Sequence, residues 1–197
     1  MDQKKFSSIR KELQLGQTVN VIMISRLVVN KGVKEFLCSA RKIVAENSNV
    51  RFFLVGPRGT EGSQAVSKVL LDEYSDVVTW LGERSDIREL LSLSHIFVLP
   101  SYYREGVPRV LLEAGALGLP LITTNMPGCK EVVVDGWNGF LVNPRSVESL
   151  IEKLHQLLAL EDQGKSMGLR NKKYIKENFD LTIVVQSYID VYKNILA

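Results

Sequence analysis

Short apolar runs that alternate with helical stretches constrain the fold of this 197-residue chain most strongly. The runs, which read as buried strands, are residues 19–25, 51–56, 77–82, 95–100, 119–124 and 139–142. Helical spacing of apolar residues separates them at 32–47, 62–74, 86–94 and 107–118, and a short helical turn is expected at 128–133. Apolar strands that alternate with helices are typical of a parallel sheet covered on both faces. The sequence therefore predicts an α/β fold with a doubly wound parallel sheet, which binds ligands at the carboxyl ends of its strands.

The two ends of the chain differ from this alternating part. Residues 1–15 are polar and read as a linker or a short docking segment. From Ser146 onward the chain is predicted to be helical, at 147–160, 162–179 and 181–196. We therefore expect one domain over residues 16–180, with C-terminal helices of which the last, in residues 181–197, is appended to it.

Composition excludes several classes of protein. A net charge of +3 is too small to indicate a nucleic-acid partner, although it leaves a local anion site open. Cys38 and Cys129 lack metal-ligand spacing and favour a reduced, cytoplasmic setting over a disulfide. Met1 is followed by polar residues, so no signal peptide is visible. The longest uncharged stretch, 114–129, is shorter than the ~20 residues of a membrane span, so we expect a protein that could touch a membrane without crossing it.

Two cations follow the first predicted strand. Arg26 and Lys31 lie in the loop 25–32, which ends at Gly32 where a helix begins. Cationic side chains beside the free backbone donors of a helix N-terminus suit an anion. The alternative is a pair of solvated loop cations without a function. Neither a Walker loop nor a GxGxxG motif is present, so the common phosphate fingerprints are missing.

Two further loops follow the next two predicted strands. The Gly-rich loop 55–62 allows close backbone approach to a ligand, although a tight turn explains its glycines better. In the loop after the third strand, Ser85 or Asp86 is the expected N-cap of a helix. Arg84 needs another explanation, and its planar guanidinium could lie against a nucleobase.

Two carboxylates mark the most core-like segment, one just before it and one within it. Glu105 stands before a helix that begins near Pro108, and Glu113 lies within that helix, four residues after Arg109. An Arg-to-Glu pair in this order is poorly oriented for an ion pair along a helix. Because the neighbours of Glu113 are apolar, we expect its carboxylate to be buried and to need polar partners. The hydroxyl groups of a bound ribose would serve.

The segments Glu105-Gly-Val-Pro…Glu113 and Ser25-Arg-Leu-x3-Lys31-Gly together resemble the donor-binding half of a GT-B, family 4 retaining glycosyltransferase. The resemblance covers the chain from Val19 to the last helix and implies one Rossmann-like half of a GT-B fold. It implies that Glu105 lies close to the transferred sugar, that Glu113 holds the ribose hydroxyls, and that Arg26 and Lys31 bind the diphosphate. Glu105, Arg26 and Lys31 are then the expected catalytic residues.

The same resemblance assigns the remaining site residues. Backbone groups of Gly106, Val107 and Pro108 would meet the sugar and the phosphates, and Arg84 matches a position that lines the nucleobase pocket. The implied reaction is departure of a nucleoside diphosphate with front-side attack by an acceptor hydroxyl and retention of configuration. A metal-binding Asp-x-Asp is absent from the sequence, so neither a metal nor a cofactor is expected.

Finer motifs narrow the resemblance. Lys31-Gly-Val-Lys-Glu-Phe, Leu81-Gly-Glu-Arg-Ser-Asp and Phe97-Val-Leu-Pro-Ser-Tyr are similar to bacterial enzymes that extend sugars on undecaprenyl-diphosphate. This implies a UDP-HexNAc donor and a lipid-linked or glycan acceptor in the assembly of surface polysaccharide or glycoprotein glycans. Arg109 would then face an anionic acceptor.

An N-terminal acceptor domain is not seen in the sequence. We therefore expect a C-terminal half that binds nucleotide weakly and turns nothing over. Its last helix, 181–197, would cross back to the missing N-terminal domain, and the full-length protein could contact the inner face of the membrane.

Other functions stay open at this point. A GT-B relative, such as a glycogen-synthase-like transferase or a nucleotide-sugar epimerase, would share the fold. A non-catalytic α/β module that binds a nucleotide or a protein partner would not need acids at both 105 and 113. A dinucleotide-dependent oxidoreductase is disfavoured because GxGxxG is missing after the first strand.

Overall fold

The computed structural model describes residues 3–58, 62–104 and 106–196. Its centre is a six-stranded sheet in the order β3-β2-β1-β4-β5-β6, in which all neighbouring strands are parallel. The strands are β1 (Val19–Ile24), β2 (Val50–Val55), β3 (Val78–Trp80), β4 (Ile96–Leu99), β5 (Leu121–Thr124) and β6 (Gly139–Val142). The doubly wound parallel fold is therefore confirmed, and its strand order reverses between β1 and β4.

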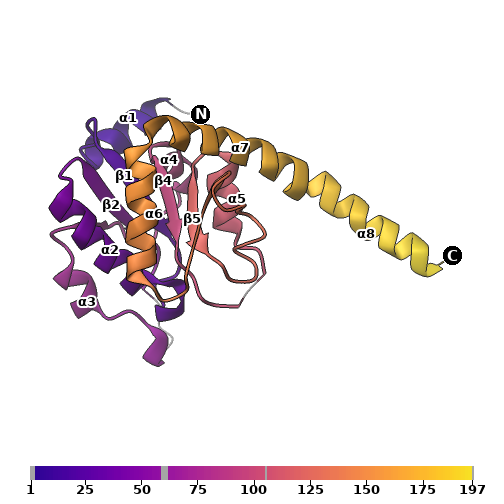
Figure 1. Cartoon of the computed structure of the whole chain (residues 1–197), viewed down its shortest axis with the longest axis horizontal. Coiled ribbons are helices and arrows are strands. Elements are labelled where there is room, and N and C mark those ends of the chain that lie inside the picture. The colour runs from indigo at the N-terminus through magenta and orange to yellow at the C-terminus, as the bar shows by residue number, and fades with distance from the viewer. Residues whose placement is uncertain (1–2, 59–61, 105, 197) are drawn as a thin grey trace.

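The described ranges contain eight α-helices and two short 3-10 helices, and all but the last α-helix lie around the sheet. The α-helices are α1 (Gln3–Glu12), α2 (Val33–Glu46), α3 (Lys68–Glu73), α4 (Ile87–Ser92), α5 (Arg109–Ala116), α6 (Val147–Ala159), α7 (Glu161–Phe179) and α8 (Leu181–Leu196). The 3-10 helices are η1 (Val29–Lys31) and η2 (Gly62–Gln64). Helix α2 packs against α6 in front of the sheet in Figure 1, while α1 packs against α4 and α5 against α7.

The apolar face of each helix explains how it covers the sheet. In α2, Val33, Phe36, Leu37, Ala40 and Ile43 recur at helical spacing and are buried. The ring of Phe36 meets that of Phe52 edge to face, with centroids 5.5 Å apart. The central strands are buried along almost their whole length, as a parallel sheet covered on both faces requires.

Two expected helices differ from the structure. The helix expected at 62–74 begins only at Lys68, because the Ser67 hydroxyl caps it by accepting from the Leu70 amide at 3.1 Å. Before that cap, the Val66 amide donates to the Leu27 carbonyl at 3.1 Å, which holds the chain out of a helix. The helical turn expected at 128–133 is wrong as well, since these residues form hydrogen-bonded turns around Gly128, whose φ is 87°.

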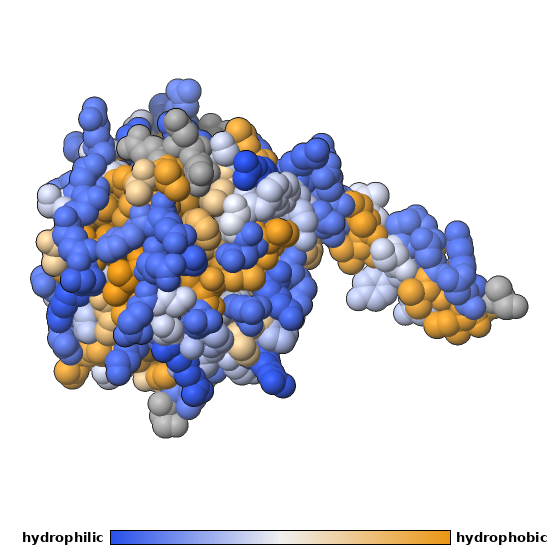
Figure 2. Space-filling model, viewed as in Figure 1, coloured by the Kyte–Doolittle hydropathy of each residue, from blue (hydrophilic) through white to orange (hydrophobic). Residues whose placement is uncertain are grey.

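The two terminal helices behave differently. Helix α1 docks on the domain by burying Ile9, and Leu13 just after it is buried too. Helix α8 continues the direction of α7 and projects from the body of the molecule (Figure 1), and none of its described residues is buried. Apolar side chains gather along it in Figure 2. No helix in the described ranges is both long enough and apolar enough to span a membrane.

Candidate functional site

A pocket of about 370 Å³ opens at the carboxyl ends of β1, β2 and β4. This is the edge where the strand order reverses, and loops from both halves of the sheet converge there. Its wall includes Arg26 and Lys31 after β1, Arg84 after β3, and Pro108 and Arg109 at the start of α5. Four predicted residues from three separate loops are thus brought together, namely Arg26 and Lys31 from the first loop, Arg84 and Pro108.

Two glycines let the loops approach closely enough to form this wall. Gly56, with φ 136°, packs so tightly on β1 that an added Cβ would lie 1.8 Å from the Ser25 carbonyl oxygen. Gly32, with φ 78°, would place a Cβ 2.2 Å from the Pro100 carbonyl oxygen. Both positions exclude a side chain for steric and conformational reasons. In the loop 55–62, Gly56 therefore serves chain packing, whereas residues 59–61 lie outside the described part.

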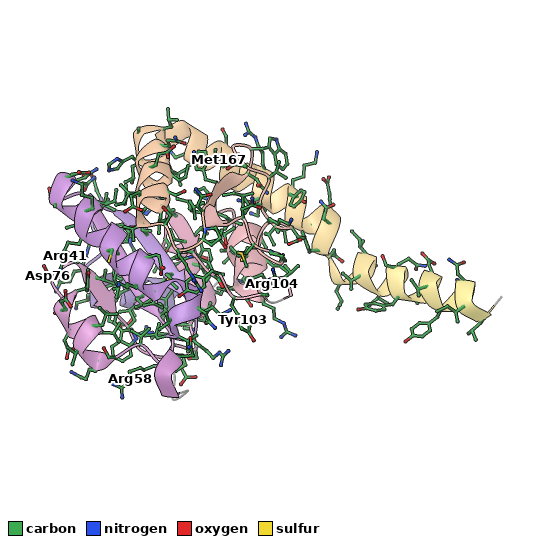
Figure 3. All side chains as sticks on the ribbon, turned by 60° about the horizontal axis from the view of Figure 1, so that its bottom comes forward. Arg41, Arg58, Asp76, Tyr103, Arg104 and Met167 are labelled. Carbon is green, nitrogen blue, oxygen red and sulfur yellow. The ribbon has the colours of Figure 1, made fainter. Side chains whose placement is uncertain are left out.

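The two cations of the first loop have different surroundings. Arg26 is exposed, whereas Lys31, in η1, is only 9% exposed. The Lys31 ammonium lies 5.6 Å from the ring centroid of Tyr103. Tyr103 lies on the loop after β4 and is labelled in Figure 3. A lysine held in a mostly desolvated position beside the N-terminus of α2 gives the pocket a fixed positive charge.

Arg84 is held by two carboxylates. Its Nε and Nη2 donate to Asp86 at 2.9 and 2.7 Å, and its Nη1 donates to Glu12 of α1 at 2.6 Å. These bonds raise the pKa of Arg84, and Arg84 in turn lowers the pKa of Asp86, so this pair stays charged at neutral pH. Asp86 occupies the N-cap position of α4 but makes no side-chain cap bond, because its carboxylate is engaged by Arg84.

The start of α5 contributes backbone donors. Pro108 is buried as the N-cap residue, and the amides of Arg109 and Val110 open the helix beside the pocket. Free amides in a first helical turn, together with the helix dipole, suit a phosphate. Gly106 is exposed and Val107 is half-buried; neither belongs to the pocket wall. Glu105 lies outside the described residues, so its role stays a prediction.

The expected burial of Glu113 is wrong. Its side chain is exposed, and its carboxylate forms no hydrogen bond or ion pair with Arg109 or any other residue in the described ranges. The reason is the amphipathic pattern of α5, which turns Leu111, Ala114 and Gly115 toward the core and leaves Glu113 on the other side. Glu113 is not among the residues of the pocket wall either. The proposed ribose contact is untested by this geometry and stays a prediction.

Sequence reasoning missed two contributors to the site. Glu83 lines the pocket directly before Arg84, and its position at the end of a predicted strand, after a glycine, was an available signal. Glu12 reaches Arg84 from 72 positions away, and no local pattern marks that contact. Within the residues that the structure describes, no three His, Cys, Asp or Glu side chains group as a metal site, and both cysteines are free thiols.

Comparisons with known proteins identify the family to which the sequence is similar. The sequence profile of the family described as "Glycosyl transferases group 1" matches residues 5–174. The chain is 35% identical over 187 residues to the N,N'-diacetylbacillosaminyl-diphospho-undecaprenol alpha-1,3-N-acetylgalactosaminyltransferase of Campylobacter jejuni, covering 94% of this chain and 47% of that protein. It is 30% identical over 173 residues to the capsular polysaccharide biosynthesis glycosyltransferase CapM of Staphylococcus aureus, covering 88% and 45%.

Solved structures share the fold over nearly the whole of this chain and about half of their own length. The crystal structure of Anabaena HepE in complex with UDP superposes with a TM-score of 0.86, at 22% identity, over 98% of this chain and 54% of that one. A glycosyltransferase from Rickettsia africae gives a TM-score of 0.86 at 20% identity, over 100% and 53%. The chain spans about half the length of the curated relatives it matches.

Proposed function

The chain belongs to the glycosyl transferases group 1 family, and we propose that it is the donor-binding half of a retaining glycosyltransferase. The resemblance to the GT-B, family 4 enzymes is confirmed at the level of family and fold. One observation carries the proposal to this chain's own residues. The pocket at the switch point of the sheet gathers Arg26, Lys31 and the first amides of α5 around one space. This is an arrangement for a diphosphate.

The proposed role of the cations follows from the reaction. When the bond between sugar and nucleotide breaks, negative charge grows on the leaving diphosphate. Arg26 and Lys31 line the pocket and would stabilise that charge more in the transition state than in the bound donor. Glu105 is proposed to lie beside the transferred sugar, and Glu113 to hold the ribose. An acceptor hydroxyl would attack from the face that the diphosphate leaves.

The proposed donor is a UDP-sugar, and its proposed sugar is an N-acetylhexosamine. Support comes from the Anabaena structure, whose title names UDP, and from the Campylobacter relative, whose name gives N-acetylgalactosaminyl transfer. The same relative acts on a diphospho-undecaprenol-linked sugar, and CapM serves capsular polysaccharide biosynthesis. We therefore propose a lipid-linked acceptor in the assembly of a bacterial surface glycan.

The other half of the relatives would complete such an enzyme. Because the chain spans about half of their length, the acceptor is proposed to meet a separate N-terminal domain of the GT-B type. Helix α8, which buries none of its described side chains, is a proposed contact to that domain. In such a two-domain protein, the site is proposed to work at the inner face of the membrane.

Calorimetric titration with UDP, GDP and ADP tests the proposal. We expect UDP to bind most tightly, and Lys31→Ala to weaken UDP binding about tenfold or more, as loss of a charge-assisted contact implies. Lys34→Ala is the matched control, because Lys34 is exposed on α2 and is not part of the pocket wall. Equal effects of the two substitutions, or no preference for UDP, would contradict the proposal.

A further inference from the structure

The guanidinium of Arg84 is fixed on two sides by carboxylates from different parts of the chain. Asp86 accepts from Nε and Nη2 at 2.9 and 2.7 Å, and Glu12 accepts from Nη1 and Nη2 at 2.6 and 3.3 Å. The Arg84 side chain is 21% exposed and the Asp86 side chain 11% exposed. Arg84 is also one of the residues of the pocket wall. A side chain with many rotamers is thus held in one orientation at the edge of the site.

This arrangement determines what Arg84 offers to a ligand. A guanidinium has five N–H groups, all in its plane, and four N–H···O bonds to the two carboxylates use its edges. These bonds use neither flat face of the group, and the flat face is the part of a guanidinium that stacks on a planar ring. The trio of one cation and two anions carries a formal charge of −1, which disfavours a phosphate. A neutral, planar ring such as a nucleobase fits it better.

Glu12 is itself held in place by the docking of α1. Ile9, one turn earlier on the same helix, is 3% exposed, and Leu13, the next residue after Glu12, is 8% exposed. Near the start of α1, Lys5 pairs with Glu89 of α4 at 2.7 Å. The helix therefore presents the Glu12 carboxylate from a packed element rather than from a free tail.

We propose that Glu12 is a positioning residue of the nucleobase site, and that α1 belongs to this site by orienting Arg84. The inference rests on the proposed function, since it assigns the base end of the same nucleotide pocket. Glu12 touches Arg84 and acts through it. Asp86 holds one edge of the guanidinium, and the second carboxylate fixes the plane against which the base stacks.

The test compares two ligands that share a diphosphate, of which only UDP carries a ribose and a base. UDP and inorganic pyrophosphate are titrated into the 197-residue chain and into Glu12→Gln. We expect Glu12→Gln to weaken UDP binding about three- to tenfold, as partial loss of one stacking contact implies, and to leave pyrophosphate binding within about twofold. Lys5→Gln is the matched control, because it removes a different charged contact of α1, the pair with Glu89 of α4, without touching Arg84. It should change neither affinity.

A double-mutant cycle separates positioning from a general loosening of α1. If Glu12 acts through Arg84, Glu12→Gln has no further effect on UDP affinity in an Arg84→Ala background. Equal weakening of UDP and pyrophosphate, equal effects of Glu12→Gln and Lys5→Gln, or an undiminished effect without Arg84 would each overturn the inference. An unchanged UDP affinity in Glu12→Gln would overturn the inference as well. If the wild-type chain binds pyrophosphate but not UDP, or binds neither, the proposed function fails first and this inference with it.

Discussion

Gly56 and Ser25 meet backbone to backbone where β1 and β2 end, so closely that a Cβ on Gly56 would lie 1.8 Å from the Ser25 carbonyl oxygen. The contact joins the loop that carries Arg26 to the loop that closes the next side of the pocket. The amide of Leu27 donates to the Pro57 carbonyl at 3.0 Å and extends the same junction. The shape of the pocket therefore depends on a position where a side chain has no room.

Gly56→Ala is expected to lower the free energy of unfolding by about 3 kcal/mol or more, because the clash is with backbone and φ is 136°. Urea denaturation measures the change. Gly16→Ala is the control, since nothing lies within 4 Å of the Cβ it would add, and it should stay within about 1 kcal/mol of wild type. Similar stabilities of the two variants would show that the loops can separate at little cost.

A second pair of glycines tests the packing of α7 on the turn after α5. A Cβ at Gly168 would lie 1.9 Å from the Gly118 carbonyl oxygen, whereas one at Gly164, on the same helix, meets nothing within 4 Å. Gly168→Ala should destabilise the fold by about 1–3 kcal/mol through overpacking. Gly164→Ala should leave it unchanged or stabilise it by up to about 1 kcal/mol. Thermal unfolding of both variants checks this, and the opposite order would contradict the packing.

Exposed Glu113 leads to a prediction about the ribose. If its carboxylate accepts from the sugar hydroxyls, the wild-type chain should bind UDP about tenfold more tightly than 2′-deoxy-UDP, as loss of a charge-assisted hydrogen bond implies. Glu113→Ala should bind both ligands equally. Because Glu113 is exposed, the substitution should leave stability nearly unchanged. If Glu113→Ala still bound UDP more tightly than 2′-deoxy-UDP, the ribose hydroxyl would not be held by Glu113.

The Arg84–Asp86 pair predicts a dependence of stability on pH. The pKa of Asp86 is lowered from its ordinary value of 3.8, chiefly because its carboxylate accepts hydrogen bonds from Arg84. A carboxyl with a lower pKa in the folded state adds stability above its unfolded pKa and loses it as the pH falls through its folded pKa. Asp86→Asn should therefore cost about 1–2 kcal/mol at pH 7. The difference in the free energy of unfolding between Asp86→Asn and wild type should shrink below pH 3.8, as denaturant titrations at several pH values would show.

The sequence predicted most of the sheet because its signal is local. Each of the six strands is a short apolar run, and a strand covered on both faces needs little else to be recognised. The start of α3 was missed because it depends on Ser67 capping the helix and on Val66 bonding to Leu27, which is far away in sequence. The Ser67 cap is a local signal that the prediction passed over, whereas the contact of Val66 with Leu27 has no local signature.

The site was predictable to the extent that its residues follow strands. Arg26, Lys31 and Arg84 lie in loops that follow the carboxyl ends of parallel strands, so the fold alone brings them to one edge. Burial of Glu113 was a wrong expectation because apolar neighbours in sequence were taken for neighbours in space, whereas α5 presents only one face to the core. The contact between Glu12 and Arg84 was beyond prediction, since it requires α1 to dock.

Nuclear magnetic resonance of the ¹⁵N-labelled chain during titration with UDP would show at which edge of the sheet the nucleotide binds. A second pocket, of about 290 Å³, lies at the amino ends of β1 and β4 beside Thr18 and His95, and it provides an internal comparison. We expect chemical-shift changes at the amides of Arg26, Gly56 and Val110, with Thr18 and His95 unchanged. Changes confined to Thr18 and His95, or none at millimolar UDP, would contradict the proposed donor site.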